Sequence, residues 1–91
     1  PEGLDVHDLE ATILGTPGVA DVHDLHVWAL TPGEPMLTAH VVIEEGEHGT
    51  QVVRQVATRL RQVHGIDHVT IQPEPPAAKL VPLRVRRRET G

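Results

Sequence analysis

The 91-residue sequence contains no cysteine, phenylalanine or tyrosine, and it has a single tryptophan. The absence of cysteine excludes disulfide scaffolds, thiolate zinc sites and cysteine nucleophiles. Because aromatic residues are almost absent, the core must be built from Val, Ile, Leu and Ala. A chain of this length buries only roughly 60 to 65% of its unfolded surface, so that core must also be thin.

Basic residues are absent from the first half of the chain, where the first one is Arg54. The formal net charge of −5 argues against a general nucleic-acid-binding role. No apolar run approaches the roughly 20 residues needed to span a bilayer, and no signal peptide is visible. We therefore expect a soluble chain, and its start at Pro1 without an initiator methionine suggests a piece of a larger protein. The acidic, histidine-containing first half is suited to cations.

Two helices are predicted from caps and apolar spacing. The first begins after the N-cap Asp5 and ends at the Pro–Gly pair 17–18. The second begins at the cap Thr50 and ends before Gly65. The apolar stripes are Val6, Leu9 and Ile13 in the first helix, and Val52, Val56, Leu60 and Val63 in the second.

Three strands are predicted at 19–30, 36–44 and 68–74. Alternation places His40 on the more polar face of the second strand, and it places His68 and Glu74 on the polar face of the third. In the first strand, regular alternation would put His23 and His26 on opposite faces. We expect His23 to sit at a strand edge or a β-bulge, where this rule need not hold.

The order helix, strand, strand, helix, strand predicts an α+β sandwich. Both helices lie on one face of a three-stranded sheet, in a ferredoxin-like arrangement that lacks its first strand. The predicted domain covers residues 1–74. Residues 75–91 are rich in proline and arginine and predict an extended tail. The open sheet face, which carries Trp28, is a candidate surface for a dimer or a ligand.

Three motifs occur in order on these predicted elements. They are GVADVHDLHVW at 18–28, LTAHVV at 37–42 and HVTIQPE at 68–74. Over about residues 4 to 74 the chain resembles the carboxy-terminal cytoplasmic domain of the cation diffusion facilitator transporters. The resemblance implies a metallochaperone-like fold that forms a homodimer on the cytoplasmic side of the cell membrane. It also implies a partner in the transmembrane domain of the same transporter, which exports Zn²⁺ or a related ion.

The resemblance also implies metal ligands. His23, His40 and Glu74 match the family's ligand positions, with Glu74 standing where related proteins have Asp. His48 lies two residues before a position, here Thr50, that carries a second-site histidine in some members.

Three further residues are weighed as ligands. His68 is a candidate because it shares the face of Glu74. Gln72 stands where some relatives have His, and a neutral amide is a poor zinc ligand. His26, with Trp28, is expected to shape the sheet face. The predicted metal residues are His23, His40, His48, His68 and Glu74, and the predicted ion is Zn²⁺, with Cd²⁺, Co²⁺ or Ni²⁺ as alternatives.

Two functions remain open at this point. The first is a regulatory domain of a zinc efflux transporter, in which metal binding rearranges a dimer. The alternative is a passive homodimerisation module whose histidines bind no metal physiologically. An enzyme is not expected, because the sequence has no nucleophile elbow or phosphate loop and an open sheet excludes water poorly.

Overall fold

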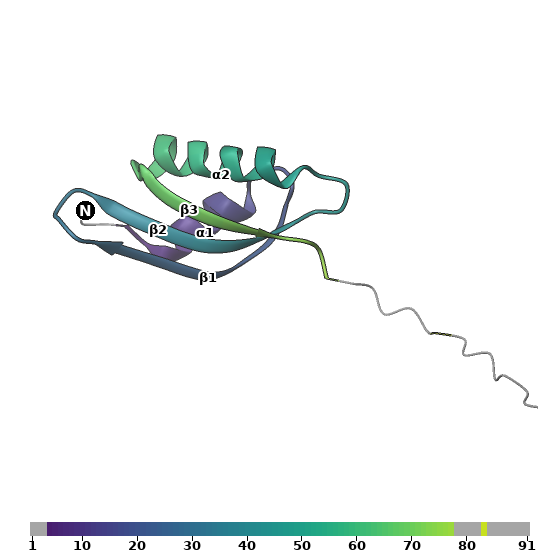
Figure 1. Cartoon of the computed structure of the whole chain (residues 1–91). Coiled ribbons are helices and arrows are strands. Elements are labelled where there is room, and N and C mark those ends of the chain that lie inside the picture. Colours follow the sequence, from purple (N-terminus) through teal and green to yellow (C-terminus); the bar gives the residue numbers. More distant parts are fainter. Residues whose placement is uncertain (1–3, 78–82, 84–91) are drawn as a thin grey trace, which may run out of the picture.

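The computed structural model describes residues 4–77 and 83. The predicted fold class is confirmed: two helices pack on one face of a three-stranded sheet of order β1-β2-β3 (Figure 1). The predicted tail falls mostly on residues 78–82 and 84–91, which lie outside the described part of the chain. The elements are α1 (Val6–Leu14), β1 (Val19–Ala29), β2 (Pro35–Ile43), α2 (Gly49–His64) and β3 (His68–Glu74).

The ends of α1 follow from local chemistry. Asp5 caps the helix as predicted, and its carboxylate accepts a hydrogen bond from the backbone N–H of His7 at 2.7 Å. The helix ends at Leu14 with Gly15 as C-cap, where the backbone N–H of Gly15 reaches the carbonyl of Ala11 at 2.9 Å. The Pro–Gly pair at 17–18 therefore follows the end of the helix, and the predicted end was late.

The second helix also differs from its prediction at one end only. Its N-cap is His48 instead of Thr50, and the His48 side chain makes no capping hydrogen bond. Its C-cap is Gly65, as predicted, with φ of 71° in the left-handed region that favours glycine. None of the helices among the described residues is long and apolar enough to cross a membrane.

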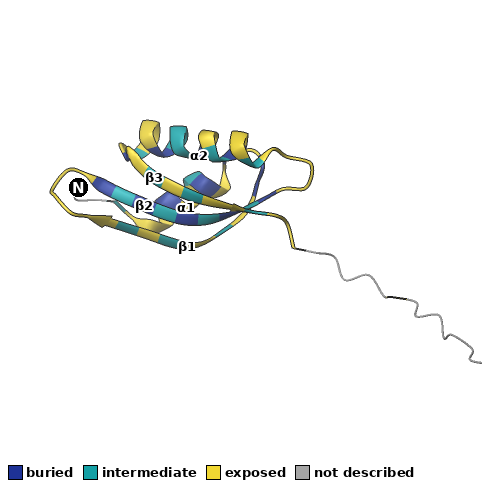
Figure 2. Cartoon of the chain, viewed as in Figure 1, coloured by how far each residue is buried: buried dark blue, intermediate teal, exposed yellow. Residues whose placement is uncertain are grey.

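The core lies between the helices and the sheet (Figure 2). Two stripe predictions were wrong: Val6 is 47% exposed and Val63 is 61% exposed. Both lie at helix ends, Val6 as the first residue of α1 and Val63 as the last but one of α2. Ile66, just beyond α2, is fully buried instead of Val63. The buried apolar residues are Leu9, Ile13, Val19, Leu37, Ala39, Val41, Ile43, Val52, Val56, Leu60 and Ile66.

The turn into β1 depends on a glycine. Gly18 has φ of +89°, and a Cβ atom built there would lie 2.6 Å from Cγ2 of the buried Val52. Both the backbone conformation and the close packing exclude a side chain. Gly18 thus lets the chain pass close to Val52 of α2 as it enters β1.

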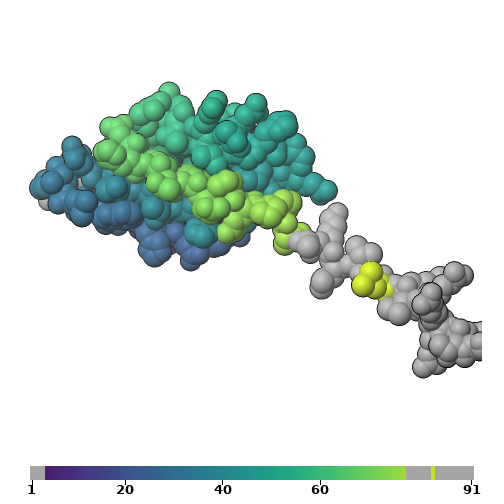
Figure 3. Space-filling model, in the orientation of Figure 1, coloured from purple at the N-terminus to yellow at the C-terminus, as the bar shows by residue number. Residues whose placement is uncertain are grey.

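Sheet pairing combines two geometries. Strands β1 and β2 are antiparallel, whereas β2 and β3 are parallel, so α2 serves as the crossover between them. In the space-filling view, α2 and β3 lie side by side on the visible face (Figure 3). Within the described residues the opposite face of the sheet carries no helix. Its side chains are mostly polar, and Trp28, Met36 and Val42 lie among them.

Candidate metal centre

Two histidines stand opposite each other on the open sheet face. His23 of β1 pairs directly with His40 of β2, and their ring centroids are 5.0 Å apart. Glu74 pairs with Val42, so it lies two residues further along than Gln72, the β3 partner of His40. Because alternate residues share a face, Glu74 extends over the same face as His40.

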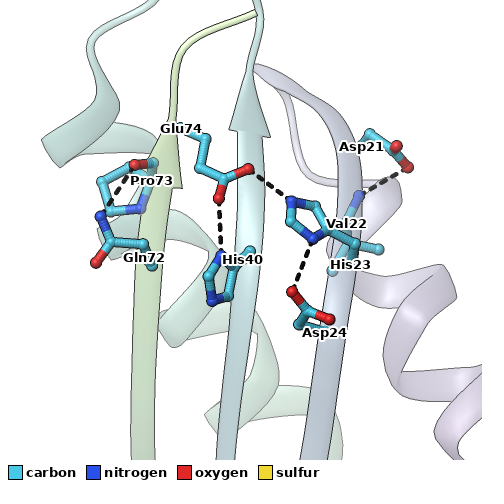
Figure 4. Close-up of polar contacts among 8 residues, drawn as sticks. All are labelled: Asp21, Val22, His23, Asp24, His40, Gln72, Pro73 and Glu74. Atoms are coloured by element: carbon cyan, nitrogen blue, oxygen red, sulfur yellow. Dashed lines mark hydrogen bonds and ion pairs between the residues drawn. The ribbon is translucent and has the colours of Figure 1, made fainter.

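The carboxylate of Glu74 joins both histidines. Its Oε1 lies 2.6 Å from Nε2 of His23, and its Oε2 lies 2.7 Å from Nδ1 of His40 (Figure 4). The side chains of His23, His40 and Glu74 are 43%, 40% and 32% exposed, respectively. Three strands thus bring two imidazoles and one carboxylate together at a site that solvent ions can reach.

A β-bulge explains how His23 reaches this face. The register of β1 against β2 shifts between His23 and His26, and Asp24 within the shift has φ of 51°. The extra residue restores His26 to the same face as His23, because His26 pairs with Thr38 and His23 with His40. The expected bulge at this part of the strand is therefore confirmed.

Asp24 is a site residue that the sequence predictions missed. Its Oδ2 lies 3.1 Å from Nδ1 of His23. His23, Asp24 and His40 each offer a donor atom within 4.8 Å of the others, a grouping that could hold a metal ion. Two features of the sequence could have indicated it. Strict alternation would put His23 and His26 on opposite faces of the sheet, and the residue after His23 is an aspartate, which tolerates the left-handed conformation.

Two carboxylates therefore flank the histidine pair. Asp24 contacts only the ring of His23, whereas the two oxygens of Glu74 contact both rings at hydrogen-bond distance. Glu74 is therefore the carboxylate better placed to share an ion with both imidazoles.

The charges of the cluster reinforce one another. The hydrogen bond with Glu74 raises the pKa of His23, and the hydrogen bond and charge of Asp24 add to this effect. The hydrogen bonds with His40 and then with His23 lower the pKa of Glu74. Both shifts favour the charged forms, the ionised carboxylate of Glu74 and the protonated imidazole of His23, so a metal ion would compete with protons for His23.

The donor set suits zinc. Zn²⁺ binds imidazole nitrogen and carboxylate oxygen at roughly 2.0 to 2.2 Å and usually takes four ligands. His23, His40 and Glu74 offer three such groups, leaving one position for water or another donor. The same donors also accept Cd²⁺, Co²⁺ and Ni²⁺.

Two other predicted ligands, His48 and His68, do not belong to the group of donor atoms at His23, Asp24 and His40 in the described part of the chain. His48 is the exposed N-cap of α2. His68 begins β3 opposite Met36 and lies six residues before Glu74, a separation of roughly 20 Å at about 3.3 Å per residue. Both stay predictions.

A neighbouring hollow occupies the sheet face beside the cluster. It has a volume of about 330 Å³, and His40 and Gln72 form part of its wall. His26 lies on this face with Trp28, which is 42% exposed. The complete lining is Asp24, His26, Thr38, Ala39, His40, Thr70 and Gln72.

Comparison with protein families gives a match over nearly all described residues. Residues 1–76 match the model of the family described as "Cation efflux protein, cytoplasmic domain". The matched range contains all five elements and the cluster of His23, His40 and Glu74. It ends at residue 76, two residues into the predicted tail.

Several whole transporters contain a similar segment. The metal cation efflux system protein CzcD of Cupriavidus metallidurans is 43% identical over 73 residues, which are 79% of this chain and 23% of that protein. The cadmium, cobalt and zinc/H(+)-K(+) antiporter of Bacillus subtilis is 39% identical, over 81% of this chain and 24% of that protein. The vacuolar zinc transporter TgZnT of Toxoplasma gondii is 42% identical, over 79% and 8%. The chain therefore spans less than a quarter of these relatives.

Solved structures show the same fold. The metal-bound C-terminal domain of the CzcD transporter from Cupriavidus metallidurans superposes with a TM-score of 0.73 at 43% identity, covering 78% of this chain and 99% of that one. A variant of MamM-CTD reaches a TM-score of 0.70 at only 10% identity, covering 79% and 94%, and it supports the fold alone. The relatives are cation efflux transporters or domains of them, and not enzymes. The chain belongs to the family of cytoplasmic domains of cation efflux proteins, the cation diffusion facilitators.

Proposed function

We propose that this domain binds Zn²⁺ through His23, His40 and Glu74 and thereby regulates a divalent cation efflux transporter. The observation that carries the proposal is the placement of one carboxylate against two imidazoles from three different strands, at 2.6 and 2.7 Å. An ion placed among these groups would replace protons that now lie between nitrogen and oxygen. It would also link β1, β2 and β3 at one end of the open sheet face.

The choice of ion rests on chemistry and on the relatives. Imidazole and carboxylate donors favour borderline divalent ions such as zinc. The names of the relatives in Bacillus subtilis and Toxoplasma gondii mention zinc, and the former also mentions cadmium and cobalt. We propose Zn²⁺ as the physiological ion, and Cd²⁺, Co²⁺ and Ni²⁺ as ions that the same donors accept.

To regulate transport, the domain must act on another part of the transporter. We propose that the chain is a cytoplasmic part of a membrane transporter and works as a homodimer. The open sheet face, with Trp28 42% exposed, supports a contact between copies beside the metal cluster. An ion bound at the edge of this face would change the relative position of two copies and of the transmembrane domain attached to them.

Calorimetric titration of the 91-residue chain with ZnCl₂ tests the binding. We expect uptake in the unmodified chain and its loss in the double variant His23→Ala/His40→Ala. The matched control is His7→Ala, which removes an exposed histidine of α1, a helix that packs on the other face of the sheet from the cluster. Undiminished binding in the double variant would exclude this site.

Small-angle scattering and sedimentation with and without zinc test the regulatory part. We expect a dimer whose scattering profile changes when zinc is added. A dimer with an unchanged profile and unchanged thermal stability would instead support the passive dimerisation module.

A further inference from the structure

We propose that Asp24 is a positioning residue for the metal site: its carboxylate accepts the Nδ1–H of His23 and so presents Nε2 of that ring to the ion. This inference rests on the proposed function and assigns Asp24 a role outside the ligand set. It follows from the two contacts of one imidazole ring and from the backbone conformation of its neighbour.

Both ring nitrogens of His23 face a carboxylate. Nε2 lies 2.6 Å from Oε1 of Glu74, and Nδ1 lies 3.1 Å from Oδ2 of Asp24 (Figure 4). A neutral imidazole has one lone pair and one N–H group. An ion on one nitrogen therefore leaves the proton on the other, where a carboxylate can accept it.

The ion belongs on the Nε2 side. There the second oxygen of Glu74 reaches Nδ1 of His40 at 2.7 Å, so three donors from three strands converge. On the Nδ1 side the carboxylate comes from the residue next to His23, and no third strand contributes. A hydrogen bond from a ligating histidine to a carboxylate fixes the tautomer and the orientation of the ring and raises the basicity of the ligand.

The bulge is what makes this contact possible. In a regular strand, Asp24 would point to the face opposite His23, which is covered by the helices. Its φ of 51° and the register shift that begins at His23 bring the carboxylate to the open face instead. The Asp24 side chain is 63% exposed, so burial does not hold it in place. The local backbone alone directs it to the ring.

Three substitutions distinguish the effect of the backbone conformation at residue 24 from the effect of the Asp24 carboxylate. Asp24→Gly keeps the left-handed conformation and removes the acceptor, whereas Asp24→Asn keeps the conformation and an acceptor oxygen but removes the charge. Asp21→Asn is the matched control, because Asp21 lies in the same strand and accepts from the backbone N–H of Val22 instead of from a ring.

Zinc titration gives the first readout. Removing the outer-sphere partner of a ligating histidine typically costs about 10- to 100-fold in metal affinity. We expect Asp24→Gly to weaken zinc binding by about tenfold, the lower end of this range, because the contact is exposed to solvent. Asp24→Asn should retain most of the affinity, and Asp21→Asn should match the unmodified chain. Circular dichroism should show the same fold in all of them.

Nitrogen-15 NMR of the zinc-loaded chain gives the second readout. We expect the His23 spectrum to show Nε2 coordinated and Nδ1 protonated. If Nδ1 is coordinated and Asp24→Asn loses as much affinity as Asp24→Gly, Asp24 is a direct ligand and the inference is overturned. If Asp24→Gly binds zinc as tightly as the unmodified chain, only the inference fails. If the unmodified chain takes up no zinc, the proposed function fails and the inference fails with it.

Discussion

Nε2 of His23 and Oε1 of Glu74 lie 2.6 Å apart although 51 residues separate them along the chain. The contact joins the two edge strands of the sheet across β2, which contributes His40 between them. A single carboxylate therefore connects all three strands on the face that the helices leave open.

Replacing Glu74 should affect zinc binding more than replacing an outer-sphere group. We expect Glu74→Gln to lower zinc affinity by more than roughly tenfold, because an amide is a poor zinc ligand and the charge between the two imidazoles is lost. Calorimetry measures this change. The matched control is Glu10→Gln in α1, which is exposed and should bind as the unmodified chain does. Equal affinities in the two variants would remove Glu74 from the ligand set.

Zinc affinity should rise with pH through and beyond the ordinary histidine range. The hydrogen bond with Glu74 raises the pKa of His23 above its usual 6.5, so protons compete with the ion to a higher pH than at a free histidine. Titrations from about pH 5 to about pH 8 check this dependence. In Glu74→Gln the remaining dependence should move to lower pH. A pH-independent affinity would contradict ligation by histidine.

The contribution of the His23–Glu74 pair to the stability of the metal-free chain should be largest between the ordinary pKa values of the two groups. The pKa of His23 is raised, so its stabilising contribution is present below 6.5 and is lost as pH rises through the folded-state value. The pKa of Glu74 is lowered, so its contribution is present above 4.5 and is lost as pH falls through the folded-state value. Urea midpoints of the unmodified chain and of His23→Gln should therefore differ most between these two values and converge at alkaline pH. A constant difference would mean that the ion pair does not contribute.

His48 and His68 should not contribute to the affinity of an ion held by the His23–His40 pair within one chain. We expect the double variant His48→Ala/His68→Ala to keep that affinity within about twofold, because the whole of β3 separates His68 from Glu74 and the donor group of His23, Asp24 and His40 does not include His48. Calorimetry should report the affinity and the number of ions. A fall in ion number at unchanged affinity would show that these histidines bind an ion elsewhere, whereas a large loss of affinity would place them in the cluster.

Gly18→Ala should destabilise the fold by roughly 1 to 3 kcal/mol, through the positive φ and the clash with Val52. Gly33→Ala is the matched control, because Gly33 has φ of +82° but nothing within 4 Å of a new Cβ atom. It should show only the backbone part of the cost. Chemical denaturation of both variants measures the difference, and equal losses would show that the close packing at Val52 does not matter.

Much of the fold could be predicted because local and global signals agree. The cap Asp5, the C-cap Gly65 and the alternation of β2 each predict the structure that is found. The boundaries were less accurate where two signals compete. Thr50 is a better capping residue than His48, yet the helix begins at Gly49, so the position of the preceding loop overrides side-chain preference.

The candidate site was only partly predictable for a physical reason. Periodicity locates His40 and Glu74, since both lie in regular strands, and it fails at His23, which adjoins a bulge. The role of Asp24 depends on one backbone torsion, φ of 51°, which strand alternation cannot show. Val6 and Val63 were wrongly assigned to the buried stripes, because a spacing rule does not say how far burial extends towards the end of a helix.

The parallel pairing of β3 has a consequence during protein synthesis. Both histidines leave the ribosome in the β1–β2 hairpin, but Glu74 follows only after α2 has crossed the sheet and β3 has docked. A nascent or truncated chain that ends before β3 presents two imidazoles without their common carboxylate. The cluster of His23, His40 and Glu74 is therefore a property of the finished domain, and an ion held by all three residues would stabilise only chains in which β3 has docked.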